Sequence, residues 1–256
     1  MCLAVIALDA HPGYRLVVAA NRDEFHARPA SPAAWGTDAT FMNILAGRDL
    51  EAGGTWLGVR RNGRYALVTN VRDGRALDST ARSRGELVPR VLNASAPFDR
   101  ALRDIADTRG RYNGFNLLAG DGTKALWMSN RSDDIEQFTD GIHGLSNALI
   151  NTPWPKLSRT IGRVQQWAAR GDADTAPLFA ALADRAPAAD AQLPATGIPL
   201  EQERLLSAPF IVSDRYGTRC STVFTIDRAG HARFHERSFD ANGDATFEAS
   251  EEFAVA

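Results

Sequence analysis

Short apolar runs broken by turn residues dominate the first part of the chain. The run from Cys2 to Asp9 and the run from Leu16 to Ala20 are separated by His11, Pro12 and Gly13, a pattern that predicts a buried β-hairpin. A second pair of runs, 55–59 and 65–69, is separated by Asn62-Gly63, which is a strong short-range hairpin signal. The beginning of the chain is therefore predicted to form antiparallel strands.

The middle of the chain alternates between helical and strand periodicity. Apolar residues spaced by three and four favour helices at 83–92 and 98–106. Pro153 and Pro155 precede a longer helix that runs to about Ala169, and a shorter helix fits 178–182. Residues 186–199 have a loop composition, but we place no domain boundary there. Strand-like runs lie at 115–119, 125–129 and 144–147.

The last third predicts strands at 210–212, 222–226 and 232–239. Strands and helices thus alternate in blocks, and the short connections between strands favour antiparallel pairing over crossover units. We expect an α+β fold in which helices pack on antiparallel sheets, and a single domain over residues 1–256.

Composition excludes several classes of protein. The 256 residues are 44% hydrophobic and 23% charged, which is typical of a globular chain. A net charge of −2 without a basic block argues against a nucleic-acid partner. The apolar runs are too short for a transmembrane segment, and no basic region precedes the first of them as in an export signal. With two cysteines only, we expect a cytoplasmic protein in a reducing compartment.

Cys2 is the first candidate for chemistry. Removal of Met1 would leave a thiol and a free α-amine on one residue, which is a nucleophile with its own base. The two groups titrate near ~8.5 and ~8 in model compounds, so a modest local field would make both useful near neutral pH. The alternative is a small apolar residue buried on the first strand.

Arg22 and Asp23 come where the second apolar run meets a loop. If the first two strands form a hairpin, this end returns beside Cys2. Arg22 would then favour the thiolate, and Asp23 would hold the α-amine. The alternative is a solvated turn with a surface ion pair.

Asn70 and Asn147 each follow an apolar run at the end of a predicted strand. An acyl-transfer site needs neutral donors aimed at the developing oxyanion, and Asn side chains or neighbouring backbone N–H groups can supply them. The alternative for both residues is the common role of asparagine as a turn former.

Three further features stay open. Arg219 either binds a substrate carboxylate or supports the pocket of the nucleophile, or it is an edge-strand charge. Cys220 is either a second reactive thiol, forming a redox pair with Cys2, or a packed strand residue. His231 and His235 share a predicted strand face without a third ligand nearby, so we expect a solvated face and no metal site.

Several ordered motifs resemble the NRDE family, also called the transport and Golgi organisation protein 2 family, over nearly the whole length. The family is named after the tetrapeptide Asn21-Arg22-Asp23-Glu24. The motifs that carry the resemblance are Met1–Leu3, Ala20–Phe25 with Arg28-Pro29, Gly47–Asp49, Gly53–Gly58, Tyr112–Asn116, Gly144–Asn147, Thr152–Lys156, Leu193–Gly197 and Tyr216–Thr222.

The family is similar in turn to the N-terminal nucleophile (Ntn) hydrolases, which implies a four-layer αββα sandwich of two antiparallel sheets. Bile-salt hydrolases and penicillin V acylases give the nearest analogy for the site, although function does not follow from fold. The analogy places catalytic roles on Cys2, Arg22, Asp23, Asn70, Asn147 and Arg219.

Two functions follow from the residues and the resemblance. The first is an N-terminal-cysteine hydrolase acting on an amide or related acyl bond of a small molecule, with no cofactor and no metal. The alternative is a non-catalytic protein that binds and moves a small molecule such as haem or a lipid, because eukaryotic members are linked to secretory organisation and haem movement. The sequence predicts no oligomeric state.

Overall fold

The computed structural model describes residues 2–255, and in this range the strands form a six-stranded sheet and a seven-stranded sheet. Sheet A has the order β10-β1-β2-β11-β12-β13, and sheet B runs from β3 to β9 in chain order; all pairings within the sheets are antiparallel. The strands of sheet A are β1 (Cys2–Leu8), β2 (Tyr14–Phe25), β10 (Gly141–Leu145), β11 (Tyr216–Asp227), β12 (His231–Phe239) and β13 (Ala245–Ala254). Those of sheet B are β3 (Ala30–Trp35), β4 (Ile44–Asp49), β5 (Leu57–Arg60), β6 (Tyr65–Asn70), β7 (Phe115–Gly120), β8 (Ala125–Ser129) and β9 (Ile135–Phe138).

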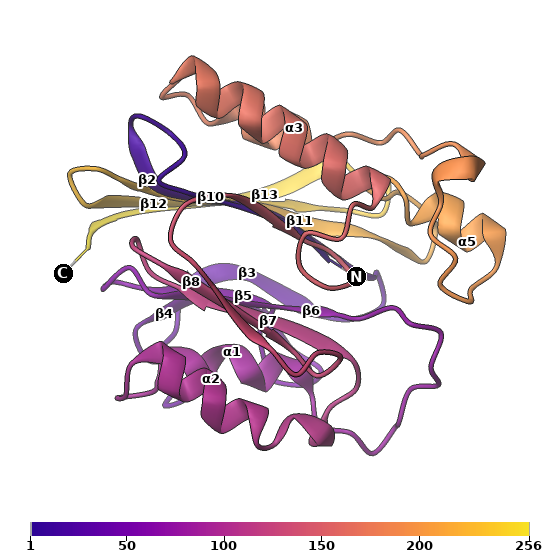
Figure 1. Cartoon of the computed structure of the whole chain (residues 1–256), viewed down its shortest axis with the longest axis horizontal. Coiled ribbons are helices and arrows are strands. Elements are labelled where there is room, and N and C mark those ends of the chain that lie inside the picture. The colour runs from indigo at the N-terminus through magenta and orange to yellow at the C-terminus, as the bar shows by residue number, and fades with distance from the viewer. Residues whose placement is uncertain (1, 256) are drawn as a thin grey trace.

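Helices cover the outer face of each sheet (Figure 1). The helices α1 (Leu87–Leu92) and α2 (Phe98–Ala106) pack on sheet B, and α3 (Pro155–Arg170) and α4 (Ala176–Leu182) pack on sheet A. The remaining helical segments are η1 (Arg84–Glu86), η2 (Arg109–Arg111), η3 (Asp190–Gln192) and α5 (Leu200–Leu205). The fold is therefore α+β with the predicted order of helix, sheet, sheet and helix.

The alternation of side chains along the strands explains these layers. On β1, Ile6 points into the core between the two sheets, whereas Val5 points into the core under α3 and α4. A third core joins sheet B to α1 and α2. Because β1 is covered on both faces, its run from residue 2 to 8 is apolar throughout and buried at every position.

The two predicted N-terminal hairpins are present as β1 with β2 and as β5 with β6. Two predicted strands differ from the structure. Residues 210–212 form no strand: the N–H of Ile211 donates to the Thr218 hydroxyl, and only the Ile211 carbonyl accepts a backbone hydrogen bond from β11, donated by the Thr218 N–H. The run 144–147 leaves its strand after Leu145. The sequence pattern also predicts no strand at β3, β4, β9 and β13; of these, β13 is an exposed edge strand with charged side chains.

No helix in residues 2–255 combines the length and the hydropathy needed to cross a membrane.

Candidate active site

Cys2 begins the first strand and lies beside Arg22 in the register of β1 and β2. Cys220 of β11 lies beside the same arginine on its other side. Directly opposed residues share a sheet face, and both cysteines belong to the core between the two sheets. They are therefore two strand spacings apart, about 10 Å, which exceeds the roughly 7 Å between Cα atoms that a disulfide spans. The structure does not support a redox pair.

Asp23 is the next residue of β2, so its side chain points to the opposite face of the strand, and it is almost completely buried. Its carboxylate accepts a hydrogen bond of 2.8 Å from the Thr218 hydroxyl. Its backbone forms a hydrogen bond with the Cys2 thiol. Burial raises the pKa of the Asp23 carboxyl, and the positive charge of Lys156 is the largest effect that opposes the rise. The predicted proximity of Cys2, Arg22 and Asp23 is thus present, but Asp23 is a buried group and not part of a solvated turn.

The electrostatic surroundings of Cys2 differ from the expectation. Burial raises the pKa of the Cys2 thiol above its ordinary value, and the charge of Arg22 reduces this rise without reversing it. Arg22 is itself mostly buried and lies 3.9 Å from Glu24. The resting thiol is therefore protonated near neutral pH, because one nearby guanidinium does not compensate for its removal from water.

Asn70 and Asn147 form one hydrogen-bonded unit. Lys156 has only donors, and its Nζ lies 3.4 Å from Asn147 Oδ1, which fixes the orientation of that amide. Asn147 Nδ2 then donates to Asn70 Oδ1 at 2.9 Å and to the Asn70 carbonyl at 3.2 Å. The Nδ2 group of Asn70 has no acceptor among the described residues. Asn70 is thus oriented as a donor, and the fully buried Asn147 lies behind it.

Lys156 is a site residue that was not expected from the sequence. It lies in the first turn of α3 with 2% of its surface exposed. Burial lowers its pKa from the ordinary 10.5 to about 8. The signal that could have found it is its place on the buried stripe of α3, four residues before Thr160 and eight before Val164.

The buried lysine predicts a pH dependence of stability. Since its pKa is lower in the folded chain, the unfolded state binds more protons between about pH 8 and pH 10.5, and stability due to Lys156 rises over this window. We expect the difference in free energy of unfolding, wild type minus Lys156→Met, to rise by up to roughly 3 kcal/mol across it. Urea unfolding of both proteins at several pH values measures this. A constant or falling difference would contradict the assignment.

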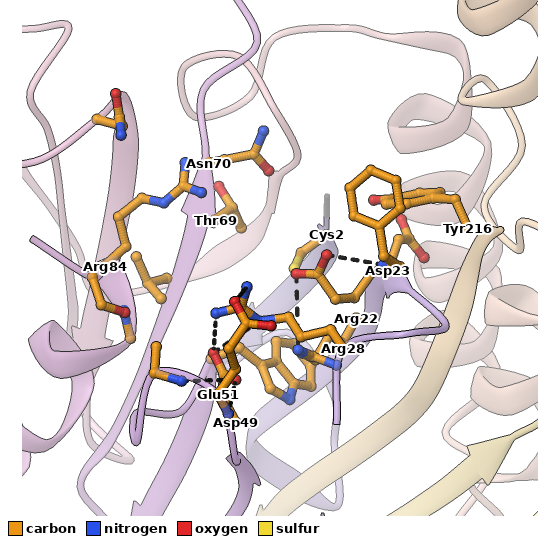
Figure 2. A pocket seen from close by; sticks show the side chains of 18 of the residues that line it. Cys2, Arg22, Asp23, Arg28, Asp49, Glu51, Thr69, Asn70, Arg84 and Tyr216 are labelled. Atoms are coloured by element: carbon orange, nitrogen blue, oxygen red, sulfur yellow. Dashed lines mark hydrogen bonds and ion pairs between the residues drawn. The ribbon is translucent and has the colours of Figure 1, made fainter. Parts of the chain in front are cut away.

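A cavity of about 900 Å³ opens beside these residues (Figure 2). Its wall includes Cys2, Arg22, Asp23 and Asn70, together with side chains from η1 and from the chain before β11. This volume is in the range of small-molecule sites. Further residues of its wall are Glu24, Arg28, Asp49, Thr69, Arg84 and Tyr216.

Arg219 lies elsewhere. It lines a smaller cavity of about 190 Å³ that also contains Cys220 and Glu236, and it does not line the cavity of Cys2. Its guanidinium donates to the carbonyl groups of Phe25, His26 and Arg28, at 3.1 to 3.3 Å. These contacts hold the segment between β2 and β3. The structure therefore brings together Cys2, Arg22, Asp23 and Asn70, and separates Arg219 from them.

Helices cover two antiparallel sheets, and a cysteine at the start of a strand lies beside the cavity between them. This arrangement is the fold of the Ntn hydrolases. An N-acylethanolamine-hydrolyzing acid amidase ortholog from Caenorhabditis elegans has this fold with a TM-score of 0.56, at 12% identity, over 87% of this chain and 92% of that one.

The chain belongs to the Transport and Golgi organisation 2 family, whose family model matches residues 1–241. The transport and Golgi organization protein 2 homolog of Homo sapiens is 37% identical over 262 residues, and that of Bos taurus is 38% identical over 264 residues. Each alignment covers 93% of both chains. The resemblance inferred from the NRDE tetrapeptide is confirmed.

Proposed function

We propose that this protein is an N-terminal-cysteine hydrolase that cleaves an amide or related acyl bond of a small molecule. The observation that carries the proposal is the placement of the Cys2 thiol on the wall of a ligand-sized cavity beside Asn70, whose amide is oriented as a donor. A nucleophile and a preset donor for an oxyanion are the two elements that acyl transfer requires.

The mechanism begins with removal of Met1, which leaves the α-amine on Cys2. Asp23 is the residue that follows the β2 partner of Cys2, which supports a role for its carboxylate in holding this amine. The amine takes the thiol proton, and the sulfur attacks the carbonyl carbon of the substrate. Asn70 Nδ2 donates to the oxyanion. The α-ammonium then protonates the leaving nitrogen as the C–N bond breaks, and water hydrolyses the thioester.

The raised pKa of Cys2 explains why the mechanism needs the α-amine. A buried thiol with this pKa is a weak nucleophile without an adjacent base, since the thiolate is the reactive form. A free α-amine titrates near ~8 and supplies that base directly on the same residue. The Caenorhabditis elegans protein with the same fold is an ortholog of an amidase that hydrolyses N-acylethanolamines, which supports the same class of reaction here.

A turnover screen tests the proposal. Purified protein is incubated with fatty-acyl amides, acyl amino acids and acyl thioesters, and release of the acyl group is followed by mass spectrometry. We expect hydrolysis of at least one class, abolished by prior alkylation of Cys2. Complete inertness of protein whose N-terminal residue is Cys2 would contradict the proposal.

The alternative function is binding and movement of haem or a lipid without catalysis. The volume of the cavity and its apolar wall residues, among them Trp56, Val68 and Leu206, favour it. A haem titration followed at the Soret band separates the two functions. Saturable binding by protein that hydrolyses nothing would favour the carrier.

We propose a cytoplasmic location for either function, because both cysteines are free and buried.

A further inference from the structure

We propose that the substrate carries an anionic group, a carboxylate or a phosphate, and that Arg84 binds this group while the scissile carbonyl faces Cys2. The proposal rests on the hydrolase function above and names the substrate class of the same cavity. Figure 2 shows Arg84 on the side of the cavity across from Cys2, with its guanidinium directed into the space between them.

The other arginines of the cavity wall are already paired with acids. Arg28 lies 2.7 Å from Asp49 and 2.8 Å from Glu51, so two carboxylates neutralise it. Arg82 lies 2.8 Å from Glu86. Arg22 lies 3.9 Å from Glu24. These side chains therefore add little net positive charge for a ligand to use.

Arg84 differs from them. Among residues 2–255 no acid lies within ion-pair distance of its guanidinium, whose hydrogen bond goes to the Gly114 carbonyl at 3.1 Å. A guanidinium has five N–H donors, so most of them stay available to a ligand. Glu24 acts on Arg84 only over a distance, and burial lowers the pKa of Arg84. A half-buried cation with unused donors is the arrangement that a ligand carboxylate or phosphate completes in bidentate geometry.

The backbone that carries Arg84 is held firmly. The carbonyl of Gly85 accepts a hydrogen bond from the N–H of Thr55 at 3.1 Å. Gly54 packs so closely on Gly85 that a Cβ atom at residue 54 would lie 2.5 Å from the Gly85 backbone. Only glycine fits there, and the contact fixes η1 against the segment before β5. Arg84 is therefore presented from a rigid support, as selective binding of one group requires.

Three probes that share one acyl chain test the proposal: N-lauroylglycine, N-lauroyl phosphoethanolamine and the neutral N-lauroylglycinamide. We expect the wild type to hydrolyse one of the two anionic amides with a kcat/KM roughly 10- to 100-fold above that of the neutral amide. The preferred anion tells carboxylate from phosphate recognition. In Arg84→Met this preference should vanish through a higher KM, while the neutral amide reacts at an unchanged rate.

The control is Arg82→Met, which removes a neighbouring arginine that Glu86 already pairs and should keep the preference. Calorimetric binding of the three probes to Cys2→Ala adds a readout that needs no turnover. Equal binding and equal hydrolysis of charged and neutral probes would overturn the role of Arg84 and leave the hydrolase intact. If no probe is hydrolysed but the anionic probes still bind more tightly than the neutral one, the proposed catalysis is contradicted and the role of Arg84 stands.

Discussion

Replacing Cys2 with alanine is expected to lower kcat/KM for the hydrolysed amide by roughly four orders of magnitude or more. The substitution removes the sulfur that forms the acyl intermediate, and alanine has no group that can attack the carbonyl carbon in its place. Substrate binding should change little, since the side chain contributes one small group to a large cavity. Steady-state kinetics together with calorimetric binding separate the two effects.

Cys220→Ala is the matched control. It removes the other buried free cysteine, which flanks Arg22 on the same face of sheet A. We expect hydrolysis within a few-fold of the wild type and a similar thermal transition for both variants. Equal activity of Cys2→Ala and the wild type, with both proteins folded, would contradict the assignment of the nucleophile.

Replacing Asn70 with alanine is expected to lower kcat by roughly 10² to 10³-fold with a small change in KM. The amide of Asn70 is oriented through Lys156 and Asn147, so its Nδ2 is a preset donor that needs no reorganisation when the oxyanion forms. A donor of this kind acts mainly in the transition state, which is why the effect belongs to kcat. Pre-steady-state measurement of the release of the leaving amine shows whether acylation is the slowed step.

Two further variants make this test specific. Asn113→Ala removes another asparagine of the cavity wall, whose amide donates to the Asp78 carbonyl and accepts from the Asp78 N–H. It should stay within a few-fold of the wild type. Lys156→Met should lower kcat less than Asn70→Ala, because it loosens the orientation of the donor without removing it. Equal kcat in Asn70→Ala and Asn113→Ala would show that Asn70 stabilises no oxyanion.

Local patterns were sufficient to predict a large part of the fold and the centre of the site. The first hairpin was readable because His11, Pro12 and Gly13 interrupt two apolar runs, and hairpin geometry alone then returns Arg22 and Asp23 to Cys2. The α2 range agrees with its predicted bounds because its apolar residues follow helical spacing strictly.

The remaining features depend on contacts between distant segments. The sequence pattern predicts a helix that includes Lys156, but only the packing of α3 on sheet A brings its side chain to Asn147. Asn70 rather than Asn147 has the available donor, because the Asn147 side chain donates to the Asn70 side chain. The two residues are 77 positions apart in the sequence, so local patterns do not reveal this bond. Arg219 lies at the register shift between Thr218 and Cys220, and such an irregularity changes where a side chain points.

The most direct test of the central claim is the intact mass and N-terminal peptide mass of the active protein after brief exposure to an acyl thioester. We predict that Met1 is absent, that the protein gains the mass of one acyl group, and that the modified residue is Cys2. Protein that retains Met1 and still hydrolyses the thioester, or an acyl group found on a residue other than Cys2, would contradict the account.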